Sequence, residues 1–218
     1  MRHVKPFIEQ TVQNNARGRG RPRQFDEKEA LDAALHVFWA KGYDGATIDD
    51  LVEAMGIGRP SLYGAFGDKE ALFARCLEHY GGTIGSKTMA AFHAAKDVHS
   101  AVRAFLRQAV VNFTGRDTPP GCIVLSVAPA VADARVRARV RASCETGVAQ
   151  IAARLRRAVR EGELPREFPV AHRARAVIDA SSALSLRARL GARRSELLAH
   201  ADEWARLLLT SVSHRRAA

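Results

Sequence analysis

The stretch that decides the fold is TIDDLVEAMGIGRPSLYGAF, which occupies residues 47–66. Its first apolar residues recur at the i, i+3, i+4, i+7 spacing of one helix face: Ile48, Leu51, Val52 and Met55. Thr47 is a good N-cap for this helix, and Asp50 three residues later can reach back in a short version of the capping box. The glycines at 56 and 58 end it, and a second short helix is predicted over 59–66. Two short helices joined by about three residues form the helix-turn-helix arrangement.

Further helices are predicted on both sides of this pair. Upstream, an amphipathic helix begins after Asp26 and ends at Lys41-Gly42, where Gly42 suits a left-handed cap. Downstream, Asp68 caps a helix that ends before Gly81-Gly82. The remaining predicted helices cover residues 98–113, a segment starting at Cys122, residues 136–159, 170–190 and 196–212. Because no strand-like alternation appears, we expect an all-α protein with an N-terminal three-helix helix-turn-helix domain and a C-terminal helical bundle.

The charge balance points to a polyanionic partner. The 218 residues include 34 basic and 23 acidic side chains, a formal net charge of +11. Nucleic acid is the simplest such partner, and an anionic membrane surface is the competitor. The charge is unevenly spread, since residues 25–84 hold five basic and eleven acidic side chains. Any contact of this segment with a polyanion therefore depends on particular positions and not on bulk charge.

One face of the second short helix is left free for a partner. Leu62 and Phe66 fill its inward stripe, so Arg59, Pro60, Ser61 and Tyr63 point outward. A single helix fits the major groove of double-stranded DNA, where these side chains would meet the bases and the backbone. The start of the preceding helix, at Thr47, can aim backbone amides at a phosphate, and Lys69 can meet the backbone on the other flank.

The N-terminus forms a separate segment by composition. Residues 14–24 (NNARGRGRPRQ) have no apolar periodicity, so we expect a flexible basic arm over 1–24, a helix-turn-helix domain over 25–84 and a C-terminal domain over 85–214. In the arm, Arg19 and Arg21 resemble a minor-groove hook, because narrow A·T-rich grooves attract arginine. A solubilising tail without a DNA role is the alternative.

Residues 26–80 resemble the DNA-binding domain of the TetR family of bacterial transcriptional regulators. The residues that carry the resemblance are the entry GYDGAT at 42–47, Gly56-Ile57, Leu62-Tyr63, Phe66 and the KEAL sequence at 69–72. The resemblance implies that Thr47, Tyr63 and Lys69 contact phosphates and that Arg59, Pro60 and Ser61 face base edges. Gly64 departs from the bulky residue often found there, and Gly58 replaces the usual Ser N-cap. Ala54 stands one residue off the usual small position.

The resemblance also implies an architecture and a mechanism. The C-terminal bundle would bind a small apolar or aromatic effector and hold a homodimer together through its last two helices. The two-fold dimer would bind a near-palindromic operator in double-stranded DNA and repress transcription until the effector releases it. Such a protein would work in the cytoplasm, associated with the nucleoid.

Cys122 is a candidate ligand or redox residue. It follows Pro119-Pro120-Gly121 and opens a predicted helix, where the helix dipole would lower the pKa of its thiol. The resemblance adds that some members of the family sense electrophiles through a cysteine in such a Gly-Cys motif, so a repressor switched at Cys122 is an alternative function. The opposing interpretation is a small buried apolar residue. Cys76 and Cys144 lie on apolar stripes and are expected in the core.

The sequence gives little support for a metalloprotein, an enzyme or a membrane-spanning protein. The histidines and cysteines have no metal-ligand spacing, and no nucleotide-binding or hydrolase motif occurs, so we expect no metal, no cofactor and no enzyme. No apolar run reaches the ~18 residues of a membrane-spanning helix. The arginines between 135 and 175 are expected to form a solvated face. A non-specific architectural DNA-binding protein stays open, as does a membrane-surface role for the basic helix at 139–160.

Overall fold

The computed structural model describes residues 25–210, and within that range the chain is helical without a strand, as predicted. The predicted arm, with Arg19 and Arg21, lies outside the described residues. The N-terminal helices are α1 (Glu27–Gly45), α2 (Ile48–Met55), α3 (Arg59–Phe66) and α4 (Lys69–Tyr80). The chain continues through the π-helical turn η1 (Gly81–Gly85), α5 (Ser86–Ala94), α6 (Val98–Phe113), the short segments η2 (Ile123–Val127) and η3 (Ala128–Ala130), α7 (Ala134–Arg160), α8 (Val170–Arg189) and α9 (Arg194–Leu209).

The caps of the helix-turn-helix are those that the sequence predicts. The hydroxyl of Thr47 accepts the Asp50 amide at 3.1 Å, and the Asp50 carboxylate accepts the Thr47 amide at 3.0 Å. Gly56 ends α2 in the left-handed conformation with a φ of 63°, which glycine adopts at little cost. Asp68 caps α4 by accepting the Ala71 amide at 2.8 Å. Local hydrogen bonds therefore set both ends of the motif.

One predicted helix end is wrong, and a second is confirmed in part. Helical dihedral angles run through Gly81 (φ −58°, ψ −44°), so 69–94 is one continuous helical rod with a π-helical turn inside it. Thr83 and Ser86 donate their hydroxyls to carbonyls of the preceding turn and support the helix where the glycines weaken it. Gly42 does interrupt α1, but with φ 76° and ψ 169° in place of a left-handed helical cap, and a further turn extends the helix to Gly45.

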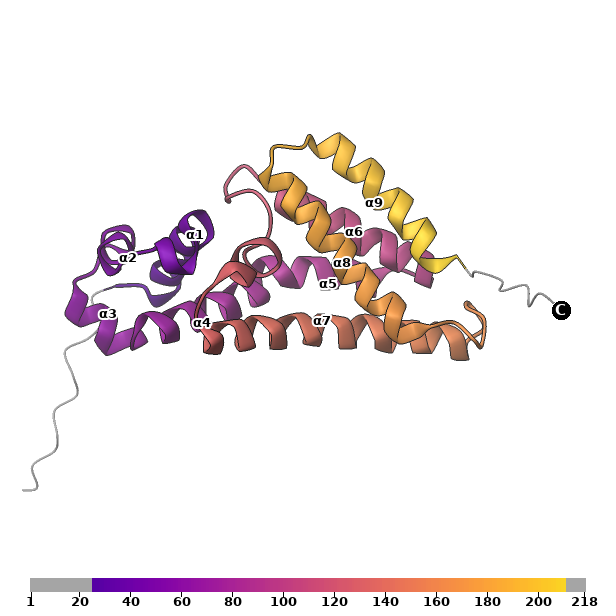
Figure 1. Cartoon of the computed structure of the whole chain (residues 1–218), viewed down its shortest axis with the longest axis horizontal. Coiled ribbons are helices and arrows are strands. Elements are labelled where there is room, and N and C mark those ends of the chain that lie inside the picture. The colour runs from indigo at the N-terminus through magenta and orange to yellow at the C-terminus, as the bar shows by residue number, and fades with distance from the viewer. Residues whose placement is uncertain (1–24, 211–218) are drawn as a thin grey trace, which may run out of the picture.

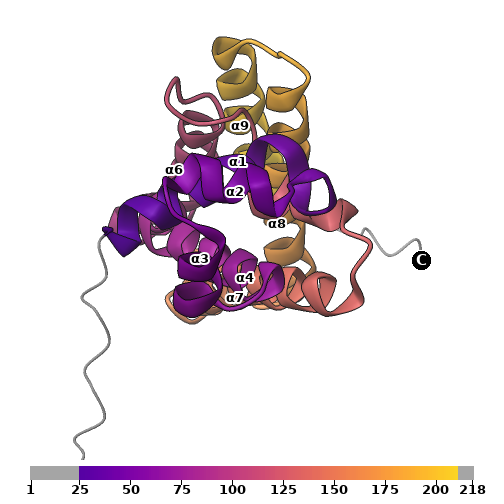
Figure 2. The same ribbon diagram turned by 90° about the vertical axis from the view of Figure 1, so that its left-hand side faces the viewer.

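The molecule is elongated, with the helix-turn-helix at one end. In Figure 1, α1–α3 gather at the left, α4 leads away from them toward the centre, and α7 runs along the lower edge beneath α8. Figure 2 looks onto the end formed by α1–α4. α1 packs on α2 and α4, α6 packs on α5, α8 and α9, and α7 packs on α8. The rod that contains α4 and α5 thus reaches from the helix-turn-helix into the C-terminal bundle.

The long C-terminal helices are amphipathic in the way the periodicity predicts. Val136, Val140, Ile151 and Leu155 of α7 are buried, whereas most of its arginines are exposed. Arg154 is the exception, because its side chain is 10% exposed and is paired with Glu163 at 3.1 Å. None of the helices between residues 25 and 210 is long and apolar enough to cross a membrane.

Neighbouring substitutions on α3 test which of its faces is inward. Leu62 is fully buried and Tyr63 is 50% exposed. Leu62→Ala is expected to lower the free energy of unfolding by about 2–5 kcal/mol, because it leaves a cavity in the core. Tyr63→Ala is expected to change it by less than about 0.5 kcal/mol. Urea denaturation followed by circular dichroism measures both, and equal losses would contradict this placement of α3.

Candidate DNA interface and effector cavity

The outward face of α3 is open along its whole length. Leu62 and Phe66 are buried in the core, whereas Arg59, Pro60 and Ser61 are exposed together with Tyr63. A Cβ built on Gly64 meets nothing within 4 Å, so this position leaves the face free of side chains. The ring of Tyr63 is 50% exposed on this face, so it is accessible from solvent.

Arg59 has an acidic partner that the sequence analysis missed. Its Nε and Nη2 both donate to Oδ1 of Asp49, at 3.1 and 2.5 Å, and these bonds raise the pKa of Arg59. The pair joins the first turn of α2 to the first turn of α3. No local sequence signal reveals the pair, because its members are ten residues apart on different helices.

Two further basic residues are held in place near the motif. Lys69 Nζ lies 4.6 Å from the centroid of the Tyr43 ring, a cation–π contact that positions the lysine at the start of α4. Lys41 donates to Asp50 at 2.6 Å. This bond and the Thr47 amide and hydroxyl lower the pKa of Asp50 to about 2, so the capping carboxylate is ionised at neutral pH. Two of the predicted phosphate-contacting residues, Thr47 and Lys69, are thus held by contacts of their own.

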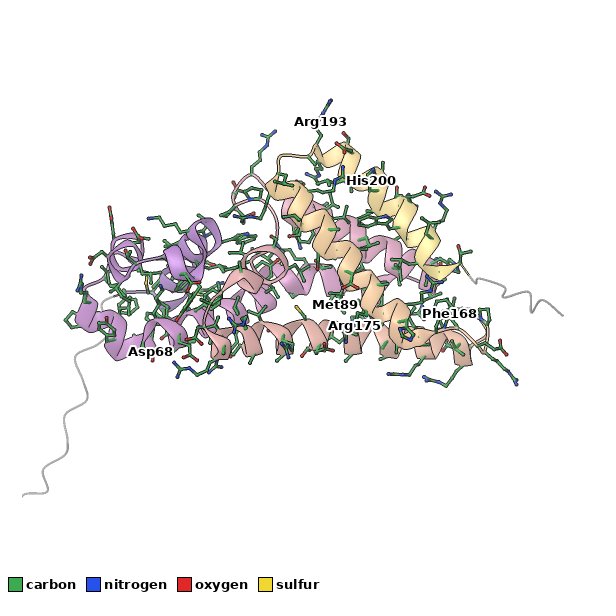
Figure 3. All side chains as sticks on the ribbon, in the orientation of Figure 1. Asp68, Met89, Phe168, Arg175, Arg193 and His200 are labelled. Atoms are coloured by element: carbon green, nitrogen blue, oxygen red, sulfur yellow. The ribbon has the colours of Figure 1, made fainter. Side chains whose placement is uncertain are left out.

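A cavity of about 510 Å³ lies behind this end of the molecule. α4, α5, α6, α7 and α8 all contribute to its walls, and Figure 3 labels one lining residue, Met89, between the ribbons of α5 and α7. Most of the lining residues are apolar, as a small apolar or aromatic effector requires. Aromatic and polar side chains also line the cavity: Tyr80, Phe105, Phe113, Cys144 and Ser181. Its size is in the range of cavities that hold drug-sized molecules.

Of the two interpretations of Cys122, the structure bears out the small buried residue and not the thiol of low pKa. Cys122 is 3% exposed, and burial raises the pKa of its thiol despite its position before η2. The thiol lines the cavity and accepts a hydrogen bond from the Tyr80 hydroxyl at 3.1 Å, while the Cys122 amide donates to Ser185 Oγ at 2.7 Å. Cys76 is buried as expected, with a pKa of about 12, whereas Cys144 is partly exposed on the cavity wall and is not a core residue.

Gly121 is required by the close packing beside Cys122. Its φ is 85°, and an added Cβ would lie 2.6 Å from Cγ of Arg189 and 2.9 Å from the Ser185 carbonyl oxygen. Only glycine combines this conformation with such a close approach. The residue therefore seats Cys122 against α8.

A helix-turn-helix with an exposed second helix, joined by one rod to a mostly apolar cavity, defines a class. It is that of the DNA-binding transcriptional regulators with an effector domain. No group of histidine, cysteine or acidic side chains among residues 25–210 is arranged to hold a metal ion.

Comparison with known proteins identifies the family. Residues 30–76 match the profile of the bacterial regulatory proteins of the tetR family, and residues 99–202 match the tetracyclin repressor-like C-terminal domain. The HTH-type transcriptional repressor ComR of Escherichia coli (strain K12) is 33% identical over 196 residues, which cover 88% of this chain and 92% of ComR. The chain belongs to the TetR family of transcriptional regulators, which is not a family of enzymes.

Solved structures share the fold. A cysteine mutant of the TetR family regulator CifR, complexed with 26-base-pair operator DNA, superposes with a TM-score of 0.81 at 34% identity, covering 85% of this chain and 98% of CifR. FadR of Bacillus subtilis, in complex with stearoyl-CoA, has a TM-score of 0.73 at 13% identity, covering 84% of this chain and 98% of FadR. The second likeness is one of fold alone.

The pair of Arg59 and Asp49 yields a prediction about DNA selectivity. Arg59→Ala is expected to weaken binding to a selected DNA sequence by about 1–3 kcal/mol and to relax the preference at one base position. Asp49→Asn releases Arg59 from its partner, so affinity for random DNA should rise relative to the selected sequence. Fluorescence anisotropy with both DNAs measures the ratio of affinities.

Glu53→Gln is the matched control for Asp49→Asn. Glu53 is an exposed acidic residue on the same helix, so its substitution removes one charge without touching Arg59. Equal changes in the affinity ratio for the two variants would show that Asp49 acts through general electrostatics and not through Arg59.

Proposed function

We propose that this protein is a ligand-responsive repressor that binds a near-palindromic operator as a homodimer. The observation that carries the proposal is the exposed face of α3 above a buried Leu62 and Phe66, which leaves a helix free to enter the major groove. The repressor name of ComR and the operator DNA in the CifR structure support it. The protein would bind its operator DNA in the cytoplasm.

We assign the DNA contacts in two groups. Thr47, Tyr63 and Lys69 would position the protein on phosphates, whereas Arg59, Pro60 and Ser61 would read base edges. Gly64 offers no side chain for base reading, so Arg19 and Arg21 of the arm would add contacts in the adjacent minor groove. The DNA-binding domain over 25–84 would transmit changes from the C-terminal domain over 85–214 through the rod that crosses their boundary.

The last two helices are proposed as the dimer interface. Leu186 of α8, Leu190 directly after the end of α8 and Leu207 of α9 are between 53% and 77% exposed in the single chain. Large apolar side chains gathered on two neighbouring helices favour a self-complementary contact, and helix pairs from two copies would then form a four-helix bundle.

The proposed function is tested by selecting bound fragments from sheared genomic DNA at near-physiological salt. A sequence-specific dimer is expected to recover a few fragments that share an inverted repeat, because its two recognition helices are related by a two-fold axis. Fragments without a common motif would favour the non-specific architectural alternative, with a steep salt dependence of binding.

The dimer interface has its own test. Leu190→Glu is expected to convert the dimer into a monomer with unchanged helix content and to abolish tight operator binding, because a charge would be buried without a partner. Arg160→Glu, on the exposed side of α7, is the matched control and should leave the dimer intact. Analytical ultracentrifugation measures the oligomeric state, and a dimeric Leu190→Glu protein would exclude this interface.

A switch at Cys122 is the second candidate function, favoured by the position of its thiol on the cavity wall beside the Tyr80 hydroxyl. Cys122→Ser separates the two candidates. A ligand-gated repressor should bind its operator as before and still be released by its effector. A thiol sensor should lose release by an electrophile such as N-ethylmaleimide while wild-type protein responds. Anisotropy with labelled operator DNA measures both responses.

A further inference from the structure

The walls of the cavity carry charge at two positions within the described part of the chain. Glu78 of α4 and Arg139 of α7 are the charged lining residues, so Arg139 is the one cation that a bound molecule would meet there. Its side chain is 55% exposed, which places it at the solvent-facing edge of the cavity. The remaining walls are mostly apolar, so a ligand would present hydrocarbon to most of the site.

Arg139 also faces an acidic residue at the DNA-binding end of the molecule. Its Nε lies 3.7 Å from Oε1 of Glu70, while Arg135 Nη2 lies 3.0 Å from Oε2 of the same carboxylate. The Glu70 side chain is 13% exposed and belongs to the first turn of α4, next to Lys69. The contact of Arg139 is longer than a hydrogen bond, so it is the more easily exchanged of the two.

A polar anchor lies among the apolar lining residues. Ser181 of α8 is 1% exposed and lines the cavity, so its hydroxyl is a polar group on a mostly apolar wall. A hydroxyl both donates and accepts hydrogen bonds, so it would bind a polar atom of a molecule in the cavity. Ser181 therefore points to an occupant with a polar atom in addition to its apolar body.

We propose that the cavity binds an apolar molecule with one anionic head group, a carboxylate or similar oxyanion, and that this group takes Arg139 away from Glu70. The inference rests on the proposed ligand-responsive function and names the chemical class of the effector. A guanidinium forms its strongest hydrogen bonds with such oxyanions. Glu78 does not oppose the anion strongly, because its side chain is exposed to water.

The transfer of Arg139 from Glu70 to the ligand would couple the cavity to DNA binding. Arg135 and Arg139 of α7 both attract Glu70 and so hold the first turn of α4 against α7. Lys69 precedes Glu70 in that turn, so the same pairs fix its position. A ligand that captures Arg139 leaves Glu70 with Arg135 alone and loosens this end of the rod. The operator-bound conformation then becomes less favourable, to the extent that the ligand prefers the loosened state.

The test uses three probes that differ only in head group: decanoate, 1-decanol and decyltrimethylammonium. Isothermal titration calorimetry of the full-length protein is expected to show that decanoate binds most tightly. Arg139→Gln should weaken decanoate binding by about tenfold or more, because a charge-assisted hydrogen bond is lost. Arg135→Gln is the matched control, since Arg135 pairs with Glu70 but does not line the cavity.

Glu70→Gln is expected to have the opposite effect on the affinity for decanoate. It removes the competitor for Arg139, so decanoate should bind about two- to fivefold more tightly, the range of a partly exposed ion pair. Emission from Trp39 locates the ligand, because its indole contacts Tyr80 of the cavity wall edge-to-face at 5.3 Å. Trp204→Phe removes the second tryptophan of the chain and leaves Trp39 as the reporter.

Three results would overturn the inference. They are equal or tighter binding of the alcohol or the ammonium probe, an unchanged decanoate affinity in Arg139→Gln, and no binding of decanoate. These three results concern ligand binding and not the binding of operator DNA by the ligand-free wild-type protein. If the wild-type protein still prefers an inverted repeat, the DNA-binding part of the proposed function remains supported. Loss of operator affinity on adding decanoate, by about fivefold or more, is the expected regulatory result.

Discussion

The packing of α4 against α1 is the contact on which the rest of the structure depends. Phe38 meets Phe73 edge-to-face with ring centroids 4.9 Å apart, and about two turns further along the rod Trp39 meets Tyr80 in the same way at 5.3 Å. The first pair belongs to the core of the helix-turn-helix. The second pair ends at a residue that lines the cavity. One helix is therefore part of both halves of the molecule, and a shift of α4 cannot occur in one half alone.

The acidic composition of the helix-turn-helix domain has a structural explanation. Asp26, Asp50 and Asp68 cap helices, and Glu70 attracts arginines of α7. Asp49 orients Arg59. These carboxylates are satisfied by amides or by cations, so the domain keeps an exposed basic and aromatic face on α3 despite its negative total. Position, and not net charge, is what makes this surface suitable for DNA.

The cavity shows how burial overrides a local electrostatic effect. Cys122 stands at the start of a short helical segment, where a dipole favours a thiolate, yet its enclosure among lining residues raises the pKa of the thiol. The hydrogen bond from Tyr80 opposes this shift without reversing it. Desolvation of a fully enclosed group outweighs one neutral hydrogen bond and the dipole of a single turn.

The sequence by itself determined the features that depend on neighbours within about one helical turn. The capping box of Thr47 and Asp50, the break at Gly56 and the inward stripe of Leu62 and Phe66 are all local, and the family follows from their order and spacing. Only the tertiary structure decided the partner of Arg59, the continuous helix through Gly81 and the shared position of Arg139 between cavity and Glu70. These depend on how helices far apart in the chain pack together, and hydrophobic periodicity states which face is buried but not what it is buried against.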